Sequence, residues 1–330
     1  IIIRRMREQI IASGGEVHFA CRMEELILER GEVRGVVCSG GRAFHGPVLL
    51  ATGHSARDVY RYLHRAEILI EAKPIAVGVR LEHPQSLIDE IRYHSPEGRG
   101  KYLPAAEYVY KAQAEGRGVY SFCMCPGGFV VPASTEPEET VVNGMSPANR
   151  GSRWANSGLV VELHPEDIPA TGIRVEDPTS PLALMQWCEA FEHKSYLAAN
   201  RSLRAPAQRM TDFVARRHSS TLPSSSYTMG LTSSDLHEWM PDFITRRLSA
   251  GFRAFDRTTR GFLTGEAQLI GVESRTSSPV RIPRDRMTYA HPVVAGLYPA
   301  GEGAGFAGGI VSAAIDGENA AQQIALALGR

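Results

Sequence analysis

The glycine-rich run near the carboxyl end of the sequence holds the residues best suited to bind a ligand. Gly303, Gly305 and Gly308 have the G-x-G-x-x-G spacing, and Glu302 directly precedes them. Glycines let backbone amides come close to a ligand, and the first turn of a helix adds unpaired amides and the positive end of the helix dipole. The run therefore predicts a strand, a turn and a helix whose start binds electron-rich oxygen or nitrogen atoms.

The same spacing could indicate a dinucleotide-binding βαβ unit, but the context does not fit. That unit needs a second strand after the helix, with an acidic residue about 20 positions on that holds a ribose hydroxyl. The sequence reaches Arg330 before such a strand. The alternative is a glycine-rich helix start that binds nothing, which is disfavoured because so many glycines cost conformational entropy.

The thiols of Cys123 and Cys125 are the next candidates for chemistry. Thiols can exchange electrons with a redox cofactor, but a disulfide in a C-x-C pair closes a strained ring, and a structural zinc site needs a second pair. A tight turn is the favoured alternative, and no metal site is expected. Arg275 could stabilise an anion or hold a carboxylate, or it could lie on a surface turn in solvent.

Polar residues also follow an apolar strand, residues 48–50, that ends in the turn Ala51-Thr52-Gly53. His54 could face a ligand at this turn. Ser55 is a good helix N-cap, and Asp58 three residues later completes a capping-box pattern, so a helix is predicted to begin here. No residue is assigned as the catalytic group; the candidates are His54, Cys123, Cys125 and Arg275.

Periodicity places a helix, a strand and a small meander before this turn. Apolar residues between Ile3 and Ile11 recur at helical spacing, and Ser13-Gly14-Gly15 ends the helix. Residues 16–20 then predict a strand, and residues 26–37 predict two short strands. These elements lead the chain into the Ala-Thr-Gly turn.

The middle of the sequence predicts a separate unit of mixed structure. Short β-prone runs separated by Gly, Pro and Asn indicate antiparallel pairing, at residues 75–81, 118–123, 129–132, 141–142 and 159–163. Residues 182–199 and 235–255 are expected to be helical. The serine-rich residues 219–226 are expected to form a loop.

The two glycine turns resemble those of two-domain FAD-dependent oxidoreductases. In that family the acidic side chain of the carboxy-terminal turn accepts a hydrogen bond from the ribityl chain, and helix-start amides face the pyrimidine edge of the flavin. The Ala-Thr-Gly turn of the family passes beside the phosphates and adenosine. The resemblance implies that FAD is bound by Met23, Thr52, Gly53, Gly301, Glu302, Gly303, Ala304, Gly305, Gly308, Gly309 and Ile310.

Longer motifs resemble a bacterial family of FAD-dependent dehydrogenases or oxidoreductases, in its carboxy-terminal region. They include Tyr120-Ser-Phe-Cys-Met-Cys-Pro-Gly-Gly128 and Glu273-Ser-Arg-Thr-Ser-Ser-Pro279. The implied fold class is α/β and α+β, with a partial Rossmann-like FAD-binding domain of the glutathione-reductase type. A large inserted substrate domain of largely antiparallel sheet and helices is expected at 71–285, between FAD-binding segments at 1–70 and 286–330.

Complete members of the families that this sequence resembles begin with a strand, a G-x-G-x-x-G turn and an acidic ribose-binding residue. Residues 1–53 do not supply this first βαβ unit. The resemblance therefore implies an amino-terminally truncated chain that holds FAD poorly and is inactive alone.

Composition narrows the class of protein. The chain has 330 residues, a formal net charge of zero and 43% hydrophobic residues, enough for a sizeable core. No apolar run reaches membrane-spanning length, and no basic stripe indicates nucleic-acid binding. Five cysteines, an odd number, favour packing thiols and a reducing compartment, so a cytoplasmic protein is expected.

These observations predict an FAD-dependent oxidoreductase that transfers hydride between the flavin and an unidentified small molecule. NAD(P)H stays open as the electron donor. Two alternatives remain: a non-catalytic FAD-binding protein, and a flavoenzyme acting on RNA, which the charge balance disfavours.

Overall fold

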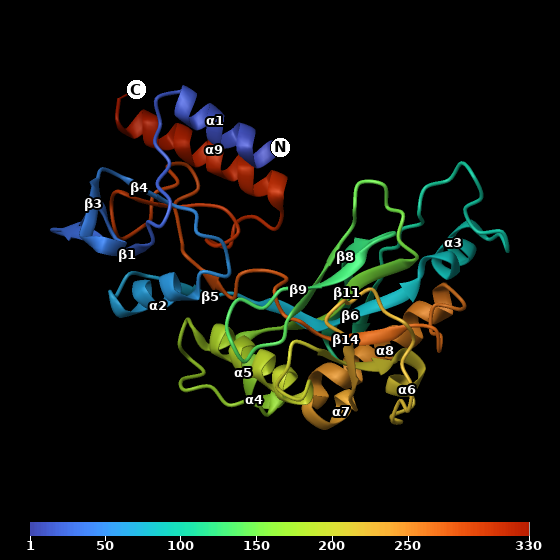
Figure 1. The fold of residues 1–330 in the computed structure, drawn as a ribbon. Coiled ribbons are helices and arrows are strands. Elements are labelled where there is room, and N and C mark those ends of the chain that lie inside the picture. Colours follow the sequence, from blue (N-terminus) through green and yellow to red (C-terminus); the bar gives the residue numbers. More distant parts are fainter. Residues whose placement is uncertain (330) are drawn as a thin grey trace.

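A seven-stranded sheet organises the larger part of the molecule in the computed structural model, which describes residues 1–329 (Figure 1). Its strand order is β13-β12-β14-β6-β11-β8-β7. Neighbouring strands are antiparallel except β12 and β13, which are parallel. The strands are β6 (Ile75–Pro84), β7 (Lys111–Ala114), β8 (Arg117–Cys125), β11 (Trp154–Leu163), β12 (Ala205–Arg209), β13 (Leu231–Ser233) and β14 (Gln268–Glu273).

The two central strands, β6 and β11, pair along their whole length, from Ile75 opposite Leu163 to Pro84 opposite Trp154. Both are buried almost throughout. Because side chains alternate across a strand, a strand buried at successive positions must be covered on both faces of its sheet.

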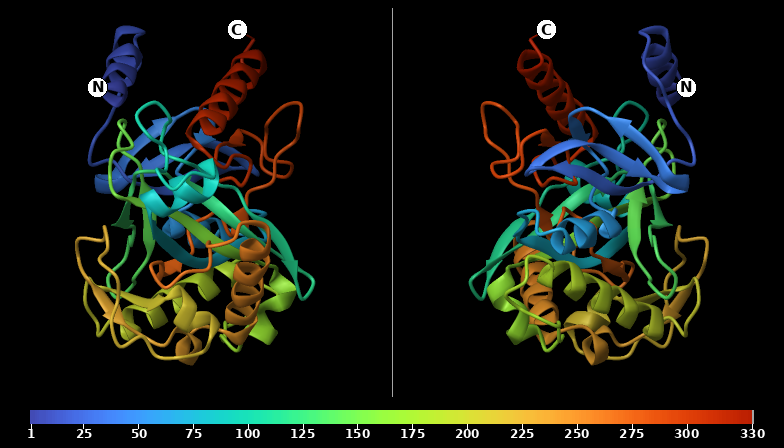
Figure 2. Two further views of the ribbon diagram at one scale, coloured as in Figure 1. Left: turned by 90° about the vertical axis from the view of Figure 1, so that its right-hand side faces the viewer. Right: turned by 90° about the vertical axis from the view of Figure 1, so that its left-hand side faces the viewer.

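Helices cover one face of the sheet (Figures 1 and 2). The apolar side chains of β6 and β11 on this side join a large core with the helical residues Trp187, Phe191 and Phe252, all fully buried. The helices of the sheet body are α3 (Gln85–Tyr93), α4 (Ile168–Thr171), α5 (Ala183–Ala198), α6 (Met210–Val214), α7 (Leu236–Trp239) and α8 (Asp242–Thr258), with the 3-10 turn η2 (Pro165–Asp167).

The opposite face carries the hairpin of β9 (Phe129–Pro132) and β10 (Val142–Met145). Strand β10 contacts β6, β8, β11 and β14. Alternation turns Arg80 and Glu82 of β6 toward this side, and both are fully buried. The hairpin therefore covers buried polar side chains of β6 beside a small apolar cluster that includes Val130, Val142 and Ile270, whereas the helical face encloses the main apolar core.

The remaining elements gather the two ends of the chain. An antiparallel meander is formed by β1 (Met23–Glu29), β2 (Glu32–Cys38) and β3 (Arg42–His45), with η1 (Ser39–Gly41) before β3. Strand β4 (Val48–Leu50) pairs in parallel with β16 (Leu297–Pro299), and β5 (Glu71–Ala72) pairs with β15 (Val280–Arg281). The helices here are α1 (Ile2–Ala12), α2 (Arg57–Arg65) and α9 (Ile310–Ala327).

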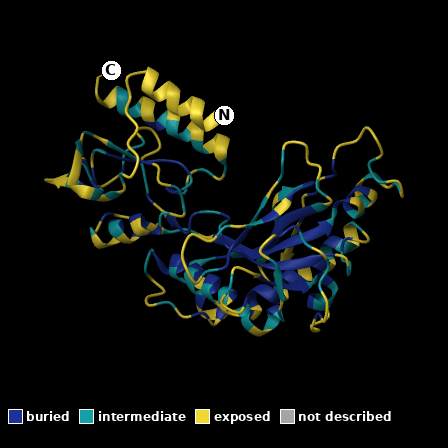
Figure 3. Cartoon of the chain, viewed as in Figure 1, coloured by how far each residue is buried: buried dark blue, intermediate teal, exposed yellow. Residues whose placement is uncertain are grey.

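This part of the molecule, which we call the turn-bearing side, has a smaller core. Leu26, Leu50, Leu63 and Leu297 pack in it together with Met185 of α5. No residue of α1 is buried, and Ala320 is the one buried residue of α9 (Figure 3). No helix within residues 1–329 combines the length and apolar character needed to cross a membrane.

Most of the predicted elements are confirmed. The five β-prone runs of the middle segment lie in β6, β8, β9, β10 and β11, and residues 182–199 correspond to α5. The helix expected at 235–255 is divided, because Pro241 follows Met240 between α7 and α8, and the residue before a proline is disfavoured in the helical conformation. Residues 16–20 form no strand.

The expected cap of α2 is wrong. The helix begins at Arg57 after Ala56, and no side chain caps it. The hydroxyl of Ser55 instead accepts a hydrogen bond from Arg275 Nη1 at 3.1 Å.

The fold class is mixed, with one large sheet and packed helices. The parallel pair of β4 and β16 has three residues in each strand, which is much smaller than the open parallel sheet of a doubly wound fold. The Rossmann-like assignment and the boundaries near residues 70 and 285 therefore stay predictions.

Candidate functional site

The two glycine turns predicted to bind a ligand lie side by side. Strands β4 and β16 run parallel, with Val48 opposite Leu297 and Leu50 opposite Pro299, so both chains leave the pair at the same edge. A Cβ atom on Gly303 would lie 2.6 Å from the carbonyl oxygen of Gly53, closer than any side chain can approach. Glycine at 303 is therefore required for the two turns to meet.

The glycines around this contact leave backbone open to an approaching ligand. Gly53 has φ +76°, a conformation that favours glycine, and neither Gly53 nor Gly308 would bring a Cβ within 4 Å of other atoms. Helix α9 begins at Ile310 without a side-chain cap at Gly309, so its first amides keep their hydrogen-bonding capacity. These features fit a bound group that places oxygen or nitrogen atoms at the turn.

Glu302 and His54 face each other across the two turns. His54 Nδ1 lies 3.1 Å from Glu302 Oε1, within ion-pair distance, although this nitrogen has no hydrogen-bond partner of good geometry among the described residues. Burial lowers the pKa of His54, and the positive charges of Arg275 and Arg57 lower it further, against the opposing effect of Glu302. His54 is therefore a neutral imidazole at neutral pH.

Tyr60 of α2 holds the turn at Gly303 through a hydrogen bond. Its hydroxyl donates a 2.6 Å hydrogen bond to the carbonyl oxygen of Gly303 and lies 2.9 Å from Ser278 Oγ. Burial raises the pKa of Tyr60 to about 12, so the phenol keeps its proton at neutral pH. Tyr60 thus ties α2 and the segment after β14 to the turn that carries Glu302.

Cys123 and Cys125 lie at the end of β8, where Arg80 contacts both residues. Arg80 Nη2 donates to the carbonyl oxygen of Cys123 at 2.6 Å and to Cys125 Sγ at 3.2 Å, and Arg80 Nη1 pairs with Glu273 Oε2 at 3.0 Å. Burial raises the pKa of Cys123, so this thiol keeps its proton at neutral pH.

The backbone at Cys123 has φ +44° inside β8, where the pairing with β11 is irregular, and the turn expected here follows at residues 126–127. The five cysteines are all free thiols.

Arg275 lies in a buried network of two arginines and two glutamates. Its Nε lies 3.0 Å from Glu192 Oε1 and its Nη2 3.2 Å from Glu139 Oε2. Arg57 contacts the same two carboxylates, at 2.9 Å for Glu139 and 2.8 Å for Glu192. The network joins α2, α5 and the end of β14, and the alternative of an arginine in solvent is wrong.

The two carboxylates of this network differ in charge state. Burial, and then the neighbouring Glu192, raise the pKa of Glu139 to about 7. Burial alone would also raise the pKa of Glu192, but Arg57 and Arg275 outweigh it and hold that pKa below its ordinary value. Glu192 therefore carries the permanent negative charge, and Glu139 exchanges a proton near neutral pH.

The sequence is similar to a known protein family in its middle segment and to one bacterial protein over almost its whole length. Residues 74–276 match the family described as FAD-dependent protein, C-terminal domain-like. The chain belongs to this family. It is also 40% identical over 327 residues, 98% of the chain, to an uncharacterized protein of Clostridium beijerinckii (strain ATCC 51743 / NCIMB 8052). The chain spans 60% of the length of that relative.

The match to the FAD-dependent protein family covers the sheet body, from β6 to β14. It contains Cys123, Cys125 and Arg275, whereas both glycine turns lie outside the matched residues. The resemblance to a family of FAD-dependent proteins is therefore confirmed for the sheet body, and the ligand contacts of the turns are argued from their geometry.

The structure brings most of the predicted site residues together in this family member. His54 and Glu302 meet at the contact between Gly53 and Gly303, whereas the printed partner of Cys123 is Arg80 of the sheet body. Met23 lies apart, where it lines a pocket of about 220 Å³ between β1 and α2, beside Val59.

Several residues of the site were not predicted from the sequence. Arg80 follows the apolar run Ile75–Val79 of β6, and a charge at this place is a signal for a buried partner. Tyr60 and Lys73 carry no comparable signal. The full set that sequence reasoning missed is Tyr60, Lys73, Arg80, Glu139, Glu192 and Glu273.

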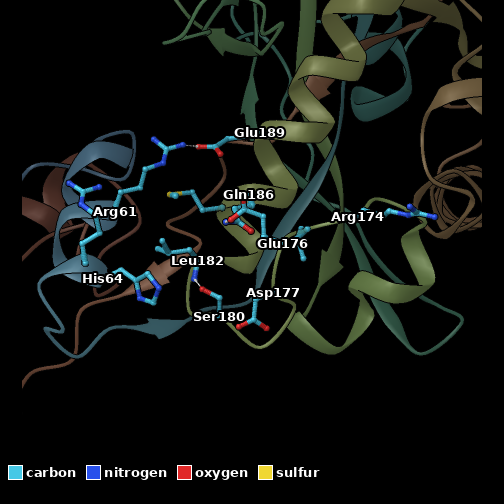
Figure 4. Close-up of a pocket in the computed structure, with 12 residues that line it drawn as sticks. Arg61, His64, Arg174, Glu176, Asp177, Ser180, Leu182, Gln186 and Glu189 are labelled. Atoms are coloured by element: carbon cyan, nitrogen blue, oxygen red, sulfur yellow. Dashed lines mark hydrogen bonds and ion pairs between the residues drawn. The ribbon is translucent and has the colours of Figure 1, made fainter.

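A larger pocket, of about 560 Å³, opens between α2 and α5 (Figure 4). Its lining mixes basic and acidic side chains, and Arg61 is already paired there with Glu189. None of the predicted site residues lines it, so cavity size does not locate the site in this molecule.

Proposed function

We propose that this chain forms the flavin-facing part of an FAD-dependent oxidoreductase that acts on a small molecule. The contact between Gly53 and Gly303, with Glu302 beside it, carries the proposal, because it leaves two open backbone turns next to one carboxylate. Membership of the FAD-dependent protein family supports the choice of FAD.

Each part of the site has a place in holding this cofactor. The amides at Gly308, Gly309 and Ile310 would face the electron-rich edge of the flavin, and Glu302 would accept a hydrogen bond from a ribityl hydroxyl. The turn at Thr52 and Gly53 would pass the phosphates, and Met23 would lie near the adenine. When bound, FAD supplies the acceptor for hydride.

The chain's own residues would accept a proton and position the elements around the flavin. Neutral His54 could take up a proton at a ring nitrogen, and Glu302, 3.1 Å from its Nδ1, would stabilise the charged form. Tyr60 fixes the turn, and the network of Arg57 and Arg275 fixes α2 against the sheet body. Cys123 is a protonated thiol at neutral pH, which favours a structural role at the end of β8 over electron exchange.

The first experiment measures FAD binding by the natural full-length protein that carries these residues. Glu302→Gln should raise the dissociation constant of FAD about tenfold. A hydrogen bond to a charged group contributes roughly 1.5–3 kcal/mol, and each 1.4 kcal/mol is about a factor of ten in affinity. Glu318→Gln, an exposed glutamate on α9, is the matched control and should bind FAD like the wild type.

The second experiment separates an enzyme from a protein that only binds FAD. The loaded protein is mixed without oxygen with NADH, NADPH or a panel of small alcohols and amines, and then exposed to air. Bleaching of the flavin absorption followed by its return supports an oxidoreductase. Bound FAD that no donor reduces would favour a non-catalytic role.

A further inference from the structure

Two basic residues, Lys73 and Arg281, lie against Gly305, three residues after Glu302. Lys73 follows β5 and Arg281 ends β15, and these strands pair, with Lys73 N donating to the carbonyl oxygen of Pro279 at 2.9 Å. A Cβ atom on Gly305 would lie 3.1 Å from Lys73 Cδ and 3.4 Å from Arg281 Cα. Gly305, at φ +84°, therefore lies directly against both residues.

Neither cation has a carboxylate partner within 4.0 Å among residues 1–329. Among the described residues, Lys73 Nζ donates to Ser277 Oγ at 3.3 Å and to the carbonyl oxygen of Pro74 at 3.5 Å. The nearby Arg284 is different, because its guanidinium is paired with Asp316. Every other arginine described at the site is likewise neutralised by a glutamate.

Lys73 is partly buried, whereas Arg281 is exposed. Burial lowers the pKa of Lys73, and the charge of Arg281 lowers it further, whereas Glu302 acts in the opposite direction. Arg281 also lies 5.5 Å from the centre of the Phe306 ring, which supports its guanidinium on one side. Two like charges kept together without a partner cost free energy that a bound anion would offset.

We propose that Lys73 and Arg281 bind an oxyanion at Gly305. This inference rests on the proposed function, and the anion is either a carboxylate of the substrate or a phosphate of the cofactor. An arginine offers a planar fork of donors that matches the two oxygens of such a group, and a lysine adds a compact charge. If the anion is a carboxylate of the substrate, the site selects acids among the small molecules that could reach the flavin.

The test compares four variants of the natural full-length protein with the wild type. Lys73→Met and Arg281→Met each remove one cation, and Lys73→Arg restores a charge. Lys111→Met, an exposed lysine on β7 in the sheet body, is the matched control. Thermal unfolding should give the same midpoint for Lys73→Met and Lys111→Met, because Lys73 Nζ makes only the two contacts above.

Two probes distinguish the sources of the anion. Pyrophosphate and benzoate are titrated calorimetrically into the protein without FAD, and FAD affinity is measured separately. We expect at least one probe to bind the wild type and Lys111→Met with equal affinity. The same probe should bind Lys73→Met and Arg281→Met about tenfold more weakly. Its affinity should recover in Lys73→Arg. A loss for pyrophosphate together with FAD identifies a cofactor phosphate, and a loss for benzoate with unchanged FAD affinity identifies a substrate carboxylate.

Two results would overturn the oxyanion site. One is that neither probe binds the wild type; the other is that Lys73→Met and Arg281→Met bind both probes and FAD as the wild type does. If that second result came with normal FAD absorption, the proposed function would stand without this site. If the wild type bound pyrophosphate through these residues but took up no FAD, the flavin proposal would fail and the anion site would stand.

Discussion

The sheet body and the turn-bearing side differ in how their residues are buried. Nearly every position of β6 and β11 is buried, and the helical face of the sheet holds a continuous apolar core. On the turn-bearing side α1 has no buried residue and α9 has one. Stability is therefore concentrated in the sheet body, whereas the candidate chemistry lies where the two parts meet.

The difference extends to charged groups. The sheet body encloses the pair of Arg80 and Glu273, both completely buried, while Lys73 and Arg281 near the turn lack carboxylate partners among the described residues. A buried charge must be paired within the protein, but a charge beside a binding site can be satisfied by a ligand. This contrast predicts which substitutions change folding and which change binding.

The largest effect is expected at Arg80. Arg80→Met should lower the free energy of unfolding by roughly 3–5 kcal/mol, because it leaves Glu273 charged and buried without its partner. Urea unfolding measures the change, and Arg257→Met, an exposed arginine on α8, is the control. Equal stability of the two variants would show that the pair does not hold the sheet body together.

The two cores can be compared directly by shortening one apolar side chain in each. Leu159→Ala in β11 should cost about 2–5 kcal/mol, because Leu159 is fully buried in the main core. Ile315→Ala in α9 should cost under about 0.5 kcal/mol, because Ile315 is 53% exposed. Comparable costs would refute the difference in burial on which the comparison rests.

A smaller loss is expected where the two glycine turns touch. Gly303→Ala should destabilise the protein by about 1–3 kcal/mol, because its methyl group would collide with the backbone of Gly53. Gly317→Ala is the matched control, since Gly317 lies inside α9 with no atom near its Cβ position. The control should be neutral or slightly stabilising, and a Gly303→Ala variant as stable as the control would show that the turns can separate freely.

The smallest expected effect is a pH dependence from Glu139. Its pKa is raised from 4.5 to about 7 in the folded protein, so the folded state binds the proton more tightly than the unfolded state. That contribution to stability is fully present below about pH 4.5 and is lost as the pH rises to about 7. Glu139→Gln cannot lose a proton and should therefore remove this decline.

The measurement for Glu139 is unfolding by urea at several pH values between 4.5 and 7. The exposed neighbour Glu138→Gln serves as the control and should keep the slope of the wild type. A Glu139→Gln variant with the same slope as this control would mean that Glu139 is ionised throughout, paired with both arginines.

Local patterns predicted much of the fold because they depend on neighbouring residues. Alternating and apolar runs located β6 and β11, and the glycine spacing around Glu302 located the turn before α9. Long-range pairs could not be predicted in this way. Arg80 meets Glu273 across 193 positions, and only the order of strands in the sheet brings them together.

The cap expected for α2 shows that a local pattern can also predict the wrong role for a residue. Ser55 has the local pattern of an N-cap, yet its hydroxyl accepts a hydrogen bond from Arg275, 220 positions away. Tertiary contacts that a local pattern does not contain therefore decide the role of a polar side chain at the site. The proximity of Lys73 to Arg281 has the same origin, because it depends on the pairing of β5 with β15.

The central claim is that the two glycine turns bind FAD. The most direct test is the visible absorption spectrum of the natural full-length protein after incubation with FAD and removal of free cofactor, beside Gly303→Ala and the control Gly317→Ala. Our account predicts flavin absorption in the wild type and in Gly317→Ala, and a strongly reduced signal in Gly303→Ala. A colourless wild-type protein, or equal flavin content in all three, would contradict it.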